Sequence, residues 1–183
     1  MIRVTETVTS HSDRATRLLT PARTTFATLI GIVVLQALIY YPQLPARLAS
    51  HFDAGGQPNG WSPKFVYFAV QGLVVLLLAL CFGALPRWVE RAPNGLVNLP
   101  NKDYWLAPER RTTTLGQIAS ALTWFGCVAL VLVIAITSLV IDFNLNRDRV
   151  LPTASIWALL GSVGVCTVAL ILRLLYLGRR PPS

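Results

Sequence analysis

The residues best suited to chemistry gather in one polar stretch, HFDAGGQPNGWSPK at 51–64, of a chain that is 54% hydrophobic. His51 and Asp53 are separated there by one residue, so an extended segment would project both side chains to the same side. An imidazole and a carboxylate so placed can ligate a metal ion, form a general acid–base pair, or hydrogen-bond to each other. Metal sites usually have three or four ligands. We therefore expect the two side chains to pin a turn, and predict no metal, cofactor or catalytic residue.

Turn-forming residues follow this pair: Gly55, Gly56, Pro58, Asn59 and Gly60. They predict that the chain folds tightly back on itself, and we expect Gly60 to adopt a positive φ angle. Trp61 comes next, and with Tyr40 and Tyr41 it is expected at the level of the lipid headgroups, where amphipathic aromatic side chains collect. The stretch is therefore interpreted as a compact turn, either structural or facing a partner.

Four apolar stretches must position this turn, at about residues 24–42, 64–85, 114–141 and 155–178. Each is close to the roughly 20 residues needed to cross a bilayer core about 30 Å thick. Charged residues make up only 13% of the chain, too few to cover four such helices from water in a soluble protein. The sequence predicts an all-α fold: a flexible cytoplasmic tail at 1–23, then an integral membrane four-helix bundle at 24–183. Its first stretch reads as an uncleaved anchor.

Lysine and arginine residues indicate the orientation of these spans. Twelve of the sixteen fall in the N-terminal tail, in residues 86–113 and at the C-terminal end, whereas four lie around residues 43–63 and 142–154. Cytoplasmic loops carry the excess of positive charge. Both termini and the second connector (residues 86–113) are therefore expected in the cytoplasm, and the first connector (residues 43–63) outside. The net charge of +8 then reports orientation and not nucleic-acid binding.

The third and fourth spans carry further signals. Pro108 and Glu109 suit the first turn of a helix, and a helix from 108 to 141 would exceed the bilayer core, so it should tilt or project. Small residues recur at every fourth position of the fourth span: Ala154, Ala158, Ser162 and Cys166. Such a stripe lets helix backbones approach closely. It predicts a helix contact, either within this chain or with another subunit.

The second connector mixes aromatic and charged side chains in the phrase NLPNKDYWLAPERR at 98–111. Its candidate partner-facing residues are Asn101, Tyr104, Trp105, Glu109 and Arg110. This composition favours an ordered segment at the membrane surface over a loose linker. Interleaved aromatic and arginine residues can also bind nucleic acid, but the patch is short and carries acidic residues, so contact with anionic lipid is preferred.

The phrases LPARLASHFDAGGQPNGWSPK and NLPNKDYWLAPERR carry a resemblance over about residues 25–115. The chain resembles the bacterial membrane domain of unknown function found at the N-terminus of Sdp-type toxin-immunity proteins. The resemblance implies a multi-pass protein of the bacterial inner membrane. Its best-described relatives are similar to immunity factors that protect against a secreted toxin and sequester a repressor at the membrane. It marks five motif positions without assigning them a role: His51, Asp53, Gly56, Gly60 and Trp61.

These features leave three classes of function open. The first is a non-enzymatic, immunity-like or signalling membrane factor that presents structured loops to protein partners. The second is a small accessory subunit of a respiratory, photosynthetic or transport complex, in a homo- or hetero-oligomer. A metal-dependent membrane enzyme using His51 and Asp53 is an outlier, because the other acidic candidates lie on the opposite side of the membrane. The spans lack ionisable residues at mid-membrane, unlike a typical transporter, and Gln36 and Gln71 are expected to form helix–helix hydrogen bonds.

Overall fold

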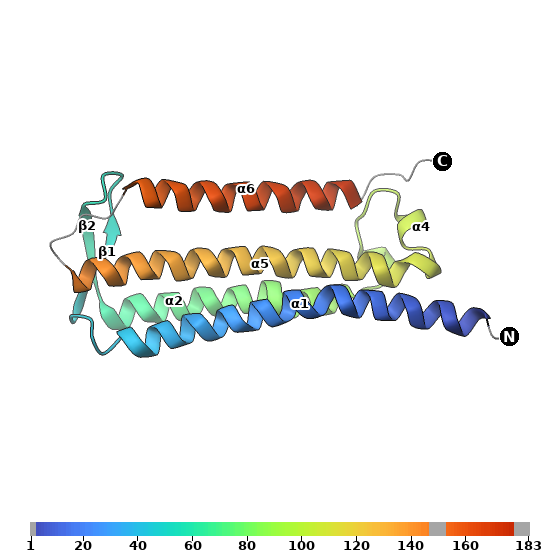
Figure 1. Cartoon of the computed structure of the whole chain (residues 1–183), viewed down its shortest axis with the longest axis horizontal. Helices are drawn as coiled ribbons and strands as arrows, with labels where there is room; N and C mark the ends of the chain where they lie inside the picture. Colours follow the sequence, from blue (N-terminus) through green and yellow to red (C-terminus); the bar gives the residue numbers. More distant parts are fainter. Residues whose placement is uncertain (1–2, 147–152, 178–183) are drawn as a thin grey trace. The chain divides into compact units, whose positions relative to one another are not determined.

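The computed structural model describes residues 3–146 and 153–177 of the chain (Figure 1). Its elements in order are α1 (Arg3–Tyr40), β1 (Arg47–Phe52), β2 (Pro58–Pro63), α2 (Lys64–Leu78), η1 (Ala79–Ala84), α3 (Leu85–Val89), η2 (Asn94–Leu96), α4 (Lys102–Trp105), α5 (Pro108–Leu145) and α6 (Thr153–Leu177). Of these, η1 is a π-helix and η2 a 3-10 helix. Residues 147–152 of the connection predicted at 142–154 lie outside the described residues.

The prediction of four apolar helices long enough to cross a membrane is confirmed. They run over Thr20–Tyr40, Lys64–Val89, Pro108–Leu145 and Ile156–Tyr176. The predicted helix start at Pro108 is also confirmed, and the 38 residues of α5 extend about 57 Å at about 1.5 Å per residue. Because α1 begins at Arg3, most of the tail predicted at 1–23 has a helical backbone. Its flexibility and the cytoplasmic location of both termini stay predictions.

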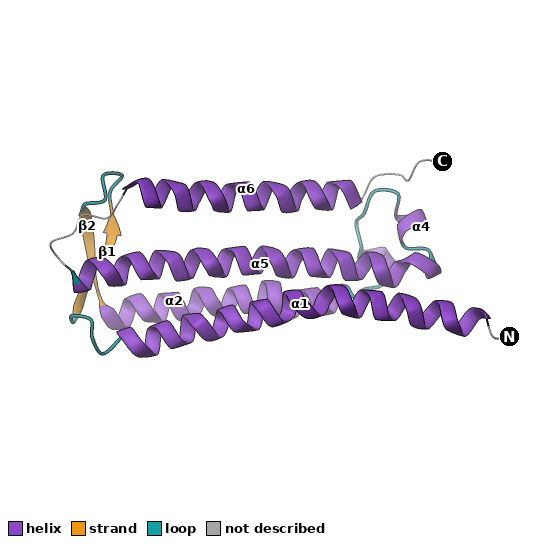
Figure 2. Ribbon diagram, viewed as in Figure 1, coloured by secondary structure: helices purple, strands orange, loops and turns teal. Residues whose placement is uncertain are grey.

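The prediction of an all-α fold is wrong at the first connector, which forms a two-stranded antiparallel sheet (Figure 2). The strands pair from Arg47 opposite Pro63 to Phe52 opposite Pro58. Sequence patterns predict the turn between them but not the strands, because RLASHF and PNGWSP are short and lack a clean alternation of apolar and polar residues. We call β1, β2 and the turn that joins them the hairpin.

The contacts of the chain divide it into two compact units, each containing parts of several helices. The first unit comprises Met1–Phe26, Ala79–Cys127 and Thr167–Ser183. The second unit comprises Ala27–Leu78 and Val128–Cys166, and therefore contains the whole hairpin. The second connector belongs entirely to the first unit.

Polar side chains join the helices of the second unit. Gln36 of α1 donates from Nε2 to Ser138 Oγ of α5 at 2.8 Å. Gln71 of α2 is buried and donates from Nε2 to Thr137 Oγ1 of α5, also at 2.8 Å. Hydrogen bonds of this kind hold helices together in lipid, where apolar contact alone gives no hydrophobic driving force. The expectation that these glutamines join helices is therefore met.

Close contact between phenylalanine and glycine residues characterises the first unit. A Cβ atom added at Gly126 of α5 would lie 2.7 Å from Phe26 Cε2, and one added at Gly83 of η1 would lie 3.1 Å from Phe26 Cε1. The rings of Phe82 and Phe125 lie nearby, with centroids 5.5 Å apart. Glycine at these two positions therefore lets α1, η1 and α5 meet around one aromatic ring.

The second span is not a uniform α-helix, because α2 passes into the π-helix η1 and continues as α3. Pro86 lies in the first turn of α3. Proline has no N–H to donate, and its ring crowds the carbonyl four residues earlier, which belongs to Phe82. The wider π turn lies directly before Pro86, where a regular α-helical hydrogen bond could not form.

Candidate functional site

The tip of the hairpin is closed by Asp53. Its Oδ1 accepts hydrogen bonds from the backbone N–H groups of Gly55 and Gln57, both at 2.9 Å. Gly56 lies between them, buried and with a φ of 79°, a conformation that a side chain would strain. Asp53 thus pins the turn through backbone amides and not through His51.

His51 lies in β1, and the strand ends at Phe52, before Asp53. The His51 Nδ1 atom is 3.1 Å from Ser50 Oγ, and Gly60 is its partner across the hairpin. A Cβ atom added at Gly60 would lie 3.0 Å from His51 Cβ and 3.2 Å from Nδ1. The expected positive φ at Gly60 is wrong, since the positive φ of the hairpin belongs to Gly56. Gly60 instead makes room for the imidazole ring.

The hairpin presents one large aromatic side chain. Along β2 the residues alternate between exposed and half-buried, and Asn59, Trp61 and Pro63 form the exposed set. Trp61 keeps 55% of its surface exposed. On β1, by contrast, Leu48 and Ala49 are buried. The exposed strand face is therefore carried by β2, with Trp61 at its centre.

Asn144, near the end of α5, anchors the other strand. Its Oδ1 accepts from the backbone N–H of Ala49 at 2.9 Å, and its Nδ2 donates to Ala49 O at 3.0 Å and to Val140 O at 2.8 Å. The buried amide thus pairs with β1 as a neighbouring strand would. The Phe52 and Phe143 rings add an edge-to-face contact with centroids 4.9 Å apart. Sequence reasoning missed Asn144, which lies beyond the predicted span end at 141, where an asparagine usually caps a helix in solvent.

Beneath the hairpin lies a small apolar cluster of Leu44, Leu48 and Ile141, packed against Tyr40, Tyr67 and Phe68. Lys64 closes one side of it. Its Nζ donates to the carbonyls of Tyr41 and Leu44 at 3.1 and 3.2 Å, and lies 4.7 Å from the centre of the Tyr41 ring. The lysine therefore satisfies two backbone carbonyls of the turn that follows α1.

A cavity of about 420 Å³ adjoins the hairpin within the second unit. The hairpin contributes Ser50, His51 and Ser62 to its lining, and α2 and α5 contribute mainly aliphatic side chains. Gln71 and Thr137, which hydrogen-bond to each other, are also part of the lining. The cavity thus combines a polar rim with an apolar wall.

Arginine side chains fix the second connector. Arg111 donates from Nε to Asn94 Oδ1 at 2.9 Å and from Nη2 to Ala92 O at 2.6 Å. Arg110 donates from Nε to Tyr104 O at 2.9 Å, and its guanidinium carbon lies 4.0 Å from the centre of the Tyr104 ring. Both arginines stand in the first turn of α5, so they tie the connector to the start of that helix.

The other candidate residues of the second connector lie around α4. Asn101 precedes α4 with a φ of 55°, a left-handed conformation that asparagine tolerates better than most residues. The Tyr104 and Trp105 rings meet edge to face with centroids 4.9 Å apart. Glu109 lies 3.8 Å from Arg110 in an exposed ion pair. These five residues therefore belong to one ordered segment.

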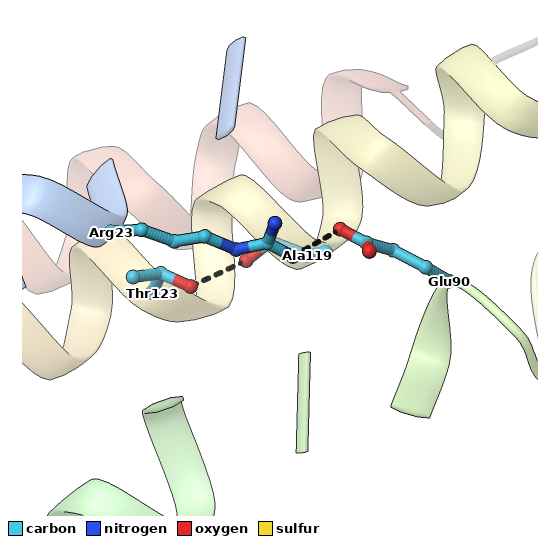
Figure 3. Close-up of polar contacts among 4 residues, drawn as sticks. All are labelled: Arg23, Glu90, Ala119 and Thr123. Atoms are coloured by element: carbon cyan, nitrogen blue, oxygen red, sulfur yellow. Dashed lines mark hydrogen bonds and ion pairs between the residues drawn. The ribbon is translucent and has the colours of Figure 1, made fainter. Parts of the chain in front are cut away.

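An ion pair connects α1 with the start of the second connector. Arg23 Nη2 lies 2.7 Å from Glu90 Oε1, and the two side chains are 34% and 27% exposed (Figure 3). On α5, the Thr123 hydroxyl donates to Ala119 O at 3.0 Å (Figure 3). Sequence reasoning used Arg23 only as a sign of orientation, because residues 67 positions apart give no periodic signal of pairing.

The remaining predicted positions are not gathered into a site. Within residues 3–146 and 153–177, no group of three or more His, Cys, Asp or Glu side chains is placed to hold a metal ion. Ala154, Ala158, Ser162 and Cys166 are all exposed. No residue of the Ile156–Tyr176 window is buried. The helix contact of the fourth span stays a prediction.

Residues 28–75 match a protein-family model described as a domain of unknown function (DUF1648). The match covers part of α1, the whole hairpin and most of α2, and it ends before the second connector. No curated protein and no solved structure matches the chain. The four apolar helices indicate a multi-pass membrane protein, and its first connector is similar to a domain without an assigned function.

Proposed function

We propose that this chain is a non-enzymatic factor of a bacterial inner membrane whose hairpin receives a protein partner outside the cytoplasm. The observation that carries the proposal is an exposed Trp61 on a fixed backbone. Tryptophan is enriched among residues that dominate binding energy, and a preorganised loop binds with a smaller loss of conformational entropy. Asp53 and Asn144 supply that preorganisation through four hydrogen bonds to the hairpin backbone. The resemblance to Sdp-type immunity proteins favours an immunity-like or signalling role, whereas the match over residues 28–75 is to a domain without an assigned function.

The contacts of the two candidate catalytic side chains also favour a non-enzymatic role. Asp53 uses its Oδ1 to close the turn, and His51 Nδ1 lies beside Ser50 Oγ. A general acid or base must lie within hydrogen-bond reach of the substrate proton that it transfers. The carboxylate of Asp53 instead serves the hairpin itself, so its chemistry is structural.

On the second connector, exposed apolar and basic side chains stand close together in the sequence. Trp88 is 56% and Leu96 is 66% exposed, and Arg87 and Arg91 are exposed beside them. This combination suits a surface that contacts anionic lipid headgroups, since aromatic side chains insert at the interface while arginines meet the phosphates. We infer that this connector lies on the cytoplasmic face and has no nucleic-acid partner.

Photo-crosslinking tests the hairpin proposal. A benzophenone amino acid is placed at Trp61 and, as a matched control, at Trp157 of α6, which is 61% exposed. In the native host we expect irradiation to give one discrete protein adduct at position 61 and none at 157. Lipid adducts alone at both positions would show that the two tryptophans are merely interfacial aromatics, and would refute the proposal.

Cysteine labelling tests the orientation on which the proposal rests. In a chain whose three native cysteines are replaced by alanine, a single cysteine is placed at Gln57 or at Asn101. An impermeant maleimide added to intact cells should label position 57 and not 101. The opposite pattern would place the hairpin in the cytoplasm.

A second candidate, an accessory subunit of a membrane complex, is favoured by α6. The Ile156–Tyr176 window has no buried residue, although Ala158 and Ser162 lie on one helix face suited to close packing. Changing both residues to leucine should weaken an assembly by about 1–3 kcal/mol through overpacking. Native electrophoresis in mild detergent should then show a smaller species, whereas Leu160→Trp on the opposite face leaves the size unchanged. An unaltered assembly in both variants would mean that this stripe meets only lipid.

A further inference from the structure

The cavity beside the hairpin is divided into a polar and an aliphatic zone. Ser50, His51 and Ser62 of the hairpin supply the polar rim. Val133 and Ile136 of α5 supply aliphatic wall, together with valines of α2. Both helices are parts of membrane spans. The polar rim therefore lies at the hairpin end of segments that are otherwise surrounded by lipid.

The α2 wall has the shape of a single stripe. Val66, Val70 and Val74 follow one another at intervals of four residues and all line the cavity. Residues so spaced lie on one helix face, and eight residues extend about 12 Å along the axis. The cavity volume of about 420 Å³ is at the lower end of the roughly 300–1,000 Å³ typical of small-molecule sites. An occupant with one narrow hydrocarbon chain fits these dimensions better than a folded peptide.

Gln71 adds a polar group to this wall. Gln71 is 9% exposed and lines the cavity. Its Nε2 donates a hydrogen bond to Thr137 Oγ1, whereas its Oε1 has no hydrogen-bond partner among the described residues. A buried acceptor without a donor is unfavourable. The oxygen is covered in this conformation, so a ligand hydroxyl would reach it after a rotation of the amide. The unused acceptor therefore points to an occupant that carries a hydrogen-bond donor.

The charge of the lining restricts the occupant further. No Lys, Arg, Asp or Glu side chain is among the residues that line the cavity. An ionised headgroup placed here would lose water without gaining an opposite charge. A neutral headgroup that can form hydrogen bonds with serine, histidine and glutamine side chains has no such cost.

We propose that this cavity binds one chain of an uncharged, hydroxyl-bearing membrane lipid of the acylglycerol type. The hydroxyl head lies among Ser50, His51, Ser62 and Gln71, and the chain follows the valine stripe of α2. A molecule with a long apolar chain partitions into the bilayer and so reaches the cavity at a raised local concentration, which favours occupancy by mass action. The proposal goes beyond the partner binding proposed for Trp61 and does not depend on it.

A photoactivatable lipid tests this site. The purified full chain is placed in phosphatidylcholine nanodiscs with monooleoylglycerol that carries a diazirine in its acyl chain, and adducts are mapped by mass spectrometry. We expect adducts on the cavity side of α2 and α5. Val70→Trp, which fills the cavity, should lower labelling at least fivefold. Leu73→Trp, on the same helix at a 56% exposed position outside the lining, should leave it unchanged.

Competition separates this lipid from others with the same chain. Unlabelled monooleoylglycerol should displace the probe at about tenfold lower concentration than methyl oleate, which has no hydroxyl, or oleic acid, which is charged. Gln71→Leu should reduce the advantage over methyl oleate to less than twofold. Thr137→Val removes the same helix–helix hydrogen bond but keeps the Gln71 amide, so as a control it should retain most of that advantage.

Three results would overturn the proposal. Labelling spread evenly over the exposed faces of α2 and α5, or insensitive to Val70→Trp, would mean ordinary annular lipid. Equal competition by methyl oleate or oleic acid would remove the hydroxyl-specific site. A benzophenone at Val74 that forms adducts with α6 or with a second copy, and none with lipid, would show that a helix covers the cavity.

Discussion

The first and second connectors are both ordered, yet different chemistry orders them. The strands of the first are held by a buried neutral amide, because Asn144 pairs with Ala49, and the carboxylate of Asp53 closes only the turn. The second is held by guanidinium groups, chiefly those of Arg110 and Arg111. Salt screens exposed charges strongly and buried neutral hydrogen bonds hardly at all. The strands of the hairpin should therefore keep their shape across ionic conditions under which the second connector loosens.

The largest effect is expected from the buried amide. Asn144→Leu leaves the backbone N–H and carbonyl of Ala49 without partners, which should destabilise the hairpin by about 3 kcal/mol, since each buried unpaired group costs about 1–3 kcal/mol. Limited proteolysis between residues 53 and 58 measures the loss. Asn146→Ala is the matched control, because Asn146 is exposed and its side chain bonds, within the described part of the chain, to Asp142 alone. Similar cleavage of both variants would contradict an anchoring role for Asn144.

A somewhat smaller effect is expected in the second connector. Arg111→Met removes two hydrogen bonds that hold Asn94 and Ala92, at a cost of about 2 kcal/mol, because bonds to charged donors contribute about 1.5–3 kcal/mol. Protease cleavage within residues 93–101 should rise, and it should rise in the unaltered chain as well when salt is added. Exposed Arg91, changed to methionine, provides the control. If the protection of the unaltered second connector did not depend on salt, the two connectors would not differ in salt sensitivity.

The next largest effect is expected from the close contact between Gly60 and His51 in the hairpin. Gly60→Val brings a branched side chain against the His51 ring and should cost about 1 kcal/mol, the lower end of overpacking penalties. Ala54→Val, at an exposed position of the turn, should be nearly neutral. Thermal unfolding in detergent compares the two variants. If His51→Ala does not restore the stability of Gly60→Val, the ring is not the source of the clash.

The smallest effect concerns the ion pair of Arg23 and Glu90. Both groups are about one-third exposed, so we expect a coupling of only about 0.5 kcal/mol, typical of surface pairs. A double-mutant cycle with Arg23→Met and Glu90→Gln measures it, and high salt should reduce it further. A coupling that is large and insensitive to salt would indicate a desolvated pair and would undo the distinction drawn between the connectors.

Sequence patterns predicted the spans well, because about 20 consecutive apolar residues need no tertiary contact to be recognised. The start of α5 at Pro108 was equally accessible, since proline at a helix start acts locally. The hairpin was only half predicted. Asp53 and Gly56 indicate a turn, but β1 is anchored by Asn144, which is 95 residues from Ala49. Contacts at that separation leave no period in the sequence. The positive φ was misplaced at Gly60 for a local reason, because three glycines stand within six residues and composition does not say which one lies in the turn.

The π-helix Ala79–Ala84 has a consequence for the register of the second span. One turn of it accommodates an additional residue, so the count of residues, and not only their composition, sets the direction in which later side chains face. Each residue of an α-helix turns the chain by about 100°. Deletion of one residue here would leave the hydrophobicity of the span nearly unchanged but would rotate Glu90 away from Arg23. A change of length in this short segment would therefore rotate the part of the span that is expected near the cytoplasm. Mean hydropathy would not detect such a change.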